Sequence, residues 1–248
     1  MNGFATAQAF VDLARVARTP DELISALTKA CDQMCVDYFA LVHHVDFARE
    51  GGSAIRLHNY PPIWQSWFDE RGLGRSDPVH RASHRSNIGF VWSAIPRMIK
   101  LTVEDQSVLA EAERVGIGAG FTVPANVPGE MLGSCSFAVA AGQEFPEEQI
   151  YAAQLIGGFA FEAARRIIRG GTQDLVYPTL TDRQRDCVLL AARGLTDKEI
   201  AKLLGLSPET VIQHLKHARE RYGVSKRALL AVRALFDGLI SFSDVFRH

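Results

Sequence analysis

Three helix starts follow one another at short spacing near the C-terminus, and they constrain the fold of this chain more than any other feature. Thr181 and Thr196 each stand three positions before a Gln or Glu, which is the pattern of a capping box. Ser207 directly precedes Pro208, the order typical of a helix cap followed by proline at the first helical position. Only two residues separate the second helix from the third. The two helices must therefore cross steeply, and the sequence predicts a helix-turn-helix.

The third of these helices has an apolar face and a polar face. Val211, Leu215, Ala218 and Tyr222 recur at intervals that place them on one stripe, which would face a small core. The opposite stripe mixes hydrogen-bonding groups with cations, which suits contact with base edges and phosphates, although a merely solvated polar face has the same composition. The candidate DNA-binding residues are Thr210, Gln213, Lys216, His217, Arg219 and Arg221.

The distribution of charge is compatible with this interpretation. The 248 residues carry a formal net charge of -1. From Val176 onward, twelve Lys and Arg stand against eight Asp and Glu, whereas the residues before it hold fifteen against twenty. A modest basic surplus permits phosphate contacts without demanding them, because many unrelated domains carry one.

The first two thirds of the chain alternate helix-like with strand-like segments. Caps and apolar periodicity predict helices at residues 7–16, from residue 20, and at 62–71, 102–115 and 146–168. Short apolar and β-favouring runs predict strands at residues 38–45, 53–58, 121–127 and 133–141. This order predicts an α/β sandwich, an antiparallel sheet with helices on both faces, followed by a small all-α helix-turn-helix domain.

A stretch that loses periodicity and gathers Gly and Pro separates the two parts. We interpret residues 169–179 as a linker, which leaves a ligand-binding domain at 1–168 and a DNA-binding domain at 180–248. No apolar run approaches the roughly 18 residues that span a bilayer, and no N-terminal signal pattern is visible. The four cysteines include no CxxC pair. We therefore expect a cytoplasmic protein without disulfides or membrane contact.

The C-terminal motifs resemble the LuxR-type helix-turn-helix along its whole length. The likeness is carried by LTDRQRD from Leu180, GLTDKEIA from Gly194 and LSPETVIQHL from Leu206. Ile212 falls where some relatives place a base-reading Arg, so the operator sequence of those relatives cannot be assigned to this protein. The resemblance implies double-stranded DNA with an inverted-repeat operator, a homodimer and, for an activator, contact with RNA polymerase. Residues 225–238 would form the pairing helix through a stripe of apolar side chains, or this stripe would cover the domain's own core; its members are Leu229, Val232, Leu235 and Phe236.

An aromatic stripe in the N-terminal part precedes two polar groups. Tyr60, Trp64 and Phe68 lie one helical turn apart, a spacing that is more often ordinary core than the wall of a binding site. Asp77, held extended before a proline, offers a carboxylate acceptor, and Trp92 offers an indole N–H donor. The two polar groups would complement an amide N–H and a carbonyl of a ligand.

The same five residues, at spacings of four, four, nine and fifteen, resemble the acyl-homoserine-lactone-binding domain of quorum-sensing LuxR regulators. The resemblance assigns the lactone ring carbonyl to Trp64, the amide N–H to Asp77 and the amide carbonyl to Tyr60. Ser136 is the matching hydroxyl position, and Phe68 replaces the usual Tyr, which leaves the acyl-chain preference open. The resemblance implies a transcription regulator whose effector is an N-acyl-homoserine lactone or a related signal, without a cofactor and without catalysis.

A metal-dependent hydrolase is the alternative from another class of function. His80 and His84 are four residues apart, which on a helix suits zinc, and Asp77 is near in the sequence. Three arginines in the same segment would oppose a divalent cation. A solvated helix face is the simpler interpretation of the two histidines.

Overall fold

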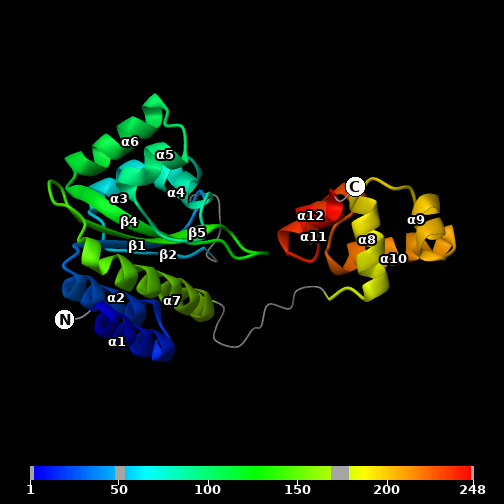
Figure 1. Cartoon of the computed structure of the whole chain (residues 1–248), viewed down its shortest axis with the longest axis horizontal. Helices are drawn as coiled ribbons and strands as arrows, with labels where there is room; N and C mark the ends of the chain where they lie inside the picture. The colour runs from blue at the N-terminus through cyan, green and yellow to red at the C-terminus, as the bar shows by residue number, and fades with distance from the viewer. Residues whose placement is uncertain (1–2, 48–53, 169–178, 247–248) are drawn as a thin grey trace. The chain divides into compact units, whose positions relative to one another are not determined.

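The computed structural model describes residues 3–47, 54–168 and 179–246. The chain divides into two compact units, of which the first contains α1 to α7 with all five strands and the second contains α8 to α12 (Figure 1). The predicted linker falls, apart from Thr179, outside the described residues. No helix in the described part of the chain is long and apolar enough to cross a membrane.

An antiparallel sheet forms the centre of the first unit. Its spatial order is β2 (Arg56–His58), β1 (Tyr38–His43), β5 (Gly133–Ala140), β4 (Ile117–Ala125) and β3 (Phe90–Val91). The pairing register aligns residues in rows across the strands. Ala40 lies opposite both His58 and Ser136, and Ser136 lies opposite Thr122. A second row, two residues further along, joins Arg56, Val42 and Ser134.

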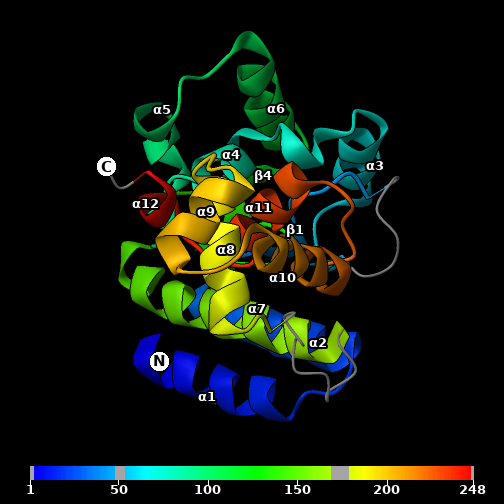
Figure 2. The same ribbon diagram turned by 90° about the vertical axis from the view of Figure 1, so that its right-hand side faces the viewer.

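Helices cover both faces of this sheet, as predicted. The helices α2 (Pro20–Met34) and α7 (Ile150–Ile168) lie against one face, and α1 (Gly3–Val16) packs outside them (Figure 2). The main core lies between these helices and the sheet, where Phe39, Phe137 and Ile156 are fully buried. The helices α3 (Pro62–Glu70), α4 (Pro78–Ser83), α5 (Ile95–Met98) and α6 (Val103–Arg114) lie on the other face (Figure 1).

Several short elements were not predicted from the sequence. They are α4, α5, β3 and the last helix α12 (Phe242–Val245). Elements of two to six residues are too short to establish an apolar period, so propensity alone does not reveal them. The fourth strand also begins four residues before the predicted start, and α7 is preceded by a 3-10 turn over Glu147–Gln149.

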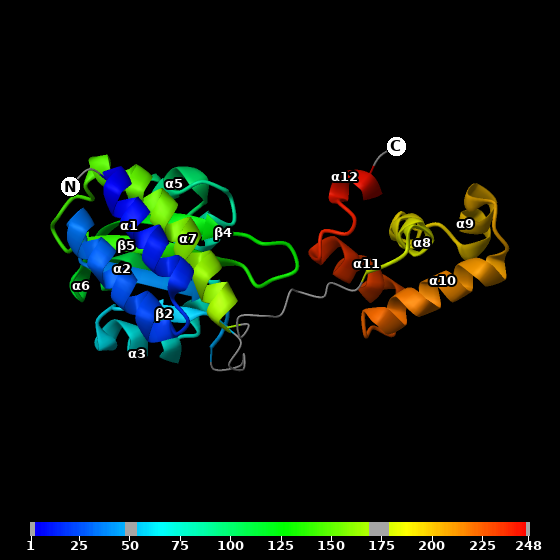
Figure 3. The same ribbon diagram turned by 90° about the horizontal axis from the view of Figure 1, so that it is seen from below.

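The second unit is a small helical domain that contains the predicted helix-turn-helix. Its helices are α8 (Asp182–Ala192), α9 (Asp197–Leu204), α10 (Pro208–Arg221), α11 (Arg227–Phe236) and α12. Figure 3 looks along α8, around which α9, α10 and α11 are arranged. The three predicted caps are confirmed: Thr181 and Thr196 form capping boxes, and Ser207 accepts from the Thr210 amide. Gly205, with φ +65°, ends α9 in the left-handed region that glycine favours.

Candidate ligand cavity and nucleic-acid interface

A cavity of about 80 Å³ lies on the face of the sheet that carries α3, α4 and α6. One buried water needs only roughly 10–15 Å³, so this cavity is larger than the space that a single water molecule occupies. All six predicted ligand-binding residues line it, namely Tyr60, Trp64, Phe68, Asp77, Trp92 and Ser136. The lining residues that were not predicted are Ala40, Val42, Phe47, Arg56, His58, Gln65, Val79, His80, Val108, Leu109, Ala112 and Ile117.

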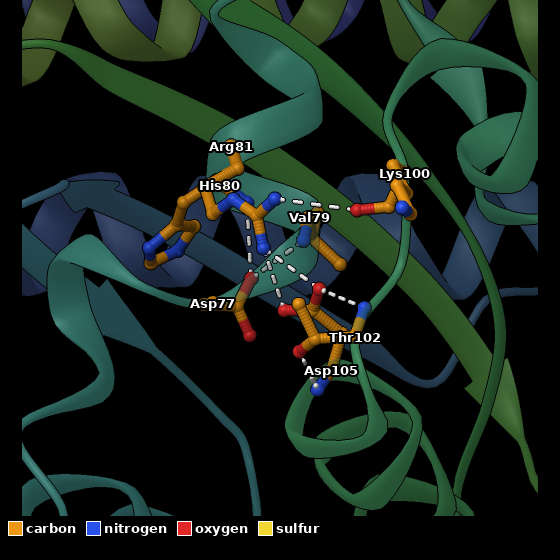
Figure 4. Close-up of polar contacts among 7 residues, drawn as sticks. All are labelled: Asp77, Val79, His80, Arg81, Lys100, Thr102 and Asp105. Carbon is orange, nitrogen blue, oxygen red and sulfur yellow. Dashed lines mark hydrogen bonds and ion pairs between the residues drawn. The ribbon is translucent and has the colours of Figure 1, made fainter.

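Asp77 is held at the cavity by its position at the start of α4. Its Oδ1 accepts hydrogen bonds from the amides of Val79, at 2.8 Å, and His80, at 2.9 Å, so the carboxylate caps the helix (Figure 4). The side chain is only 5% exposed. No hydrogen bond from another described residue occupies its second oxygen, Oδ2, which is therefore available as an acceptor.

An ion pair fastens α4 to α6. The Arg81 guanidinium donates to both carboxylate oxygens of Asp105 at 2.7 Å, and Asp105 also accepts from the Thr102 amide at the start of α6 (Figure 4). Burial alone would raise the pKa of Asp105, but the Thr102 amide and the Arg81 guanidinium outweigh burial and lower it. The carboxylate therefore stays ionised at neutral pH and keeps the Asp77-capped helix against its neighbour.

Two aromatic donors face the same space. Burial, together with the nearby Asp77 carboxylate, raises the pKa of Tyr60, so its hydroxyl remains protonated at neutral pH. The ring centroids of Trp64 and Phe68 lie 5.7 Å apart, and both residues line the cavity. Among the described residues, none accepts a hydrogen bond from the Tyr60 hydroxyl or the Trp64 indole. These two donors and Asp77 Oδ2 are thus free polar groups at one cavity.

Trp92 is engaged differently from the prediction. Its indole N–H, expected to serve a ligand carbonyl, donates instead to Thr122 Oγ1 at 2.8 Å, and this oxygen lies 2.8 Å from Ser136 Oγ. Trp92, Thr122 and Ser136 therefore form a hydrogen-bonded chain in the wall. Thr122 is fully buried and was not singled out from the sequence. Its position in a predicted strand was visible, but its partner depends on the register between β4 and β5.

A group of histidines lies beside the cavity. His80 Nδ1 is 2.8 Å from the Gly74 carbonyl, and its ring stacks on His44 with centroids 4.0 Å apart. His44 Nδ1 lies 2.8 Å from His84 Nε2, and its Nε2 lies 2.9 Å from Ser134 Oγ. Burial, and then the neighbouring histidines, lower the pKa of His44 well below its usual value. In the described part of the chain, no three His, Cys, Asp or Glu residues are placed to hold a metal ion.

The third helix of the second unit presents the predicted polar face. Val211, Leu215 and Ala218 are buried in the small core, which confirms the apolar stripe. The residues Thr210, Gln213, Lys216, His217 and Arg221 are exposed and Arg219 is partly exposed. Some of them also have partners within the domain: Lys216 with Glu220, Thr210 with Ser207, Arg219 with the Ser225 carbonyl and Arg221 with the Thr179 carbonyl.

The predicted pairing helix is α11, and it uses two faces. Leu230 and Ala234 are buried in the domain core. Leu229, Val232 and Phe236 are 48%, 62% and 43% exposed, so this stripe does not serve the core of its own domain. Leu235, the remaining member of the predicted stripe, is partly buried.

A domain whose cavity holds free polar groups, joined in one chain to a helix-turn-helix domain, defines the class of ligand-controlled transcription regulators. Residues 19–164 match the family described as autoinducer binding domain, and residues 178–234 match the family of bacterial regulatory proteins, luxR family. The chain belongs to the LuxR family of autoinducer-binding transcriptional regulators. Members of this family regulate transcription and are not enzymes.

Individual relatives agree with this assignment. The chain is 29% identical over 183 residues to the HTH-type transcriptional regulator y4qH of Sinorhizobium fredii, covering 73% of this chain and 56% of that protein. It is 26% identical over 209 residues to the transcriptional activator LuxR of Aliivibrio fischeri, covering 82% and 81%. The crystal structure of Escherichia coli SdiA has a TM-score of 0.68 at 24% identity, covering 96% of this chain and 98% of that one. The fold is therefore shared with SdiA.

Proposed function

We propose that the cavity of the first unit binds an N-acyl-homoserine lactone and that its occupation sets the DNA affinity of α10. The observation that carries this proposal is the convergence of three free polar groups, Tyr60 Oη, Trp64 Nε1 and Asp77 Oδ2, on one largely apolar cavity. An acylated homoserine lactone offers two carbonyls and one amide N–H, which complement two donors and one acceptor.

Each residue has a distinct role in this proposal. Asp77 Oδ2 accepts from the ligand amide while Oδ1 continues to cap α4. Tyr60 donates to the amide carbonyl, and Trp64 donates to the ring carbonyl. Phe68 and Trp92 supply aromatic wall, and Ser136, already bonded to Thr122, supplies a hydroxyl beside the bound amide.

The output of the proposed regulator is binding of α10 in the major groove of an inverted-repeat operator. The exposed stripe of Leu229, Val232 and Phe236 on α11 pairs with the same stripe of a second copy and forms the homodimer that such an operator requires. In this proposal residues 1–168 receive the signal, 169–179 link the domains and 180–248 bind DNA. An activator of this kind also contacts RNA polymerase, in the cytoplasm where the chromosome lies.

Asp77→Asn tests the ligand assignment because asparagine can still cap α4 while the charged acceptor is lost. Calorimetry with N-octanoyl-homoserine lactone should show a loss of about 1.5 to 3 kcal/mol in binding free energy, the usual contribution of a hydrogen bond to a charged group. Asp12→Asn, at an exposed position of α1, is the matched control and should bind as the unmodified protein does. Unchanged affinity in a folded Asp77→Asn protein would contradict the assigned role.

A further inference from the structure

The cavity has two chemically different sides. Val108, Leu109 and Ala112 of α6 form an apolar side, whereas Arg56, His58 and His80 place polar groups in the lining. An unsubstituted alkyl chain would complement the first side only. The second side is therefore the feature of the cavity that a saturated acyl tail does not explain.

The sheet register places the polar side relative to the proposed ligand. Ser136, beside the ligand amide, belongs to the row that contains Ala40 and His58. The row of Arg56, Val42 and Ser134 lies two residues along the strands, at a distance of roughly 7 Å. His44 binds Ser134 in this second row and stacks on His80. Trp64, which takes the ring carbonyl in the proposed function, packs in one cluster with Ala138, two residues from Ser136 in the opposite direction along β5. With the lactone ring on that side of the amide, the acyl tail extends toward the second row and reaches His80.

The hydrogen bond to Gly74 fixes what His80 can offer to such a tail. A carbonyl oxygen only accepts, so the proton of the neutral imidazole lies on Nδ1 and Nε2 is left as an acceptor. His80 is only 8% exposed, and no described residue donates to Nε2. His58 Nδ1 is also buried without a partner among the described residues. Two imidazole nitrogens at this cavity thus lack hydrogen bonds.

Arg56 differs from the histidines because it already has partners. Its Nη2 donates to both carboxylate oxygens of Asp69, at 2.9 and 2.8 Å, and the guanidinium lies 4.7 Å from the centre of the Phe47 ring. Its charge is thereby balanced, so the side chain does not demand an anionic tail. The unmet requirement of the polar side is a hydrogen-bond donor.

We propose that the cavity selects an acyl tail that carries a hydroxyl group, which donates its proton to Nε2 of His80. This inference rests on the proposed function and specifies its ligand. Asp77 and His80 are three residues apart on α4, or roughly 4.5 Å along the helix axis. A hydroxyl on the third to fifth carbon of the tail therefore spans the distance from the amide. A site with a buried acceptor rejects an analogue that lacks the donor, because the acceptor would be dehydrated without a partner.

The test compares N-octanoyl-homoserine lactone with its derivatives that carry a hydroxyl or a keto group on the third or the fifth carbon. Isothermal calorimetry should show that one hydroxylated ligand binds about tenfold more tightly than the unsubstituted ligand, as one well-formed hydrogen bond provides. The keto ligands should gain nothing, because a ketone cannot donate to Nε2.

His80→Asn is the informative variant, since its amide can still donate to Gly74 but has no atom at the position of Nε2. It should bind the hydroxylated and unsubstituted lactones equally. His84→Asn, the same change on an exposed residue that does not line the cavity, should retain the preference. If the unmodified protein binds the ligands with equal affinity or prefers a keto group, the tail assignment is wrong although the lactone function stands. If it binds none of them, both proposals fail.

Discussion

At the scale of single residues, Asp77 serves the fold and the cavity with different oxygens. Oδ1 satisfies two amides at the start of α4, and Oδ2 remains open. Because the helix cap already restricts the rotation of the carboxylate, the side chain loses its conformational entropy when the protein folds. Ligand binding therefore does not have to order this acceptor. This division explains how a buried carboxylate is tolerated without a cationic partner among the described residues.

The buried His44 makes the stability of the first unit dependent on pH. Its pKa is lowered in the folded protein by burial and by His80, His84 and His43, whereas an unfolded histidine titrates near 6.5. Because the folded pKa is the lower one, its contribution is complete above about pH 6.5 and is lost as the pH falls toward the folded value. The free energy of unfolding should therefore decrease between pH 7 and pH 5.

His44→Phe keeps an aromatic ring for stacking but removes the titration. In urea unfolding followed at several pH values, the slope against pH in this window should be smaller by up to about 1.4 kcal/mol per pH unit, the value for one proton. His217→Phe, on the exposed face of α10, is the control and should keep the slope of the unmodified protein. Equal slopes for His44→Phe and the unmodified protein would show that another group governs the acid sensitivity.

The predictability of the site differs between its residues. The aromatic stripe and Asp77 were found from the sequence because their spacing along one short segment is itself the signal. Thr122 takes its role from hydrogen bonds with Trp92 and Ser136, which are far away in the sequence. His80 takes its role from the tautomer that its hydrogen bond to the Gly74 carbonyl fixes. Local patterns do not specify such contacts, so the same reasoning assigned His80 only to a zinc site or a solvated face.

At the scale of elements, the start of α10 depends on one hydroxyl. Ser207 Oγ accepts from the Thr210 amide at 3.1 Å. Ser207→Ala should reduce the free energy of unfolding of the second unit by about 1 kcal/mol, the usual cost of losing a cap. Circular dichroism of the full chain during thermal unfolding measures the change, with Ser225→Ala as a control at an exposed loop residue. An unaltered transition would mean that the turn before α10, and not the cap, sets the start of the helix.

The exposed face of α10 permits a separation of base contacts from phosphate contacts. Gln213→Ala and Lys216→Ala should each cost about 1 to 3 kcal/mol and relax preference at particular base positions if these side chains reach base edges. Arg221→Ala should weaken binding evenly across sequences and flatten its salt dependence, because a phosphate contact releases counterions. Fluorescence anisotropy with a labelled inverted repeat gives both quantities. Unaltered affinity and specificity in both the Gln213 and Lys216 variants would exclude α10 as the reading helix.

Long elements were predictable and short ones were not. The capped helices of the second unit and the long helices of the first repeat their apolar residues often enough to define a face. By contrast, α4 is only six residues long, yet it carries Asp77 at its start and His80 within it. Its stability comes from the local cap and from the tertiary bond between Arg81 and Asp105, and neither contact leaves a periodic signal in the sequence.

At the scale of the whole molecule, the proposed dimer makes a geometric prediction about its operator. Two recognition helices related by twofold symmetry must meet the same face of the duplex, so the half-site centres should lie about 10 base pairs apart or at a multiple of that. Inserting about five base pairs between the half-sites should abolish high-affinity binding, and a full turn should restore much of it, in gel-shift titrations. Tight binding regardless of spacing would contradict a symmetric dimer.

The order of the two domains and their fold classes could be predicted from the sequence, whereas the polar lining of the cavity could not. Alternating helices and strands, a break in periodicity and three capped helices predicted an α/β sandwich followed by a helix-turn-helix domain. The ligand's tail was not predictable in the same way. Arg56 and His58 are on a three-residue strand, and only its pairing with β1 brings them to the cavity.

The distribution of tryptophan gives the molecule a built-in optical probe. The chain has three tryptophans, of which Trp64 and Trp92 line the cavity and Trp67 stacks on Trp64 with ring centroids 5.4 Å apart. The DNA-binding helices contain none. Indole emission excited near 295 nm therefore originates entirely in the signal-receiving unit. The wavelength and intensity of this emission depend on the surroundings of the cavity. Structural changes confined to the DNA-binding unit do not alter the emission spectrum directly.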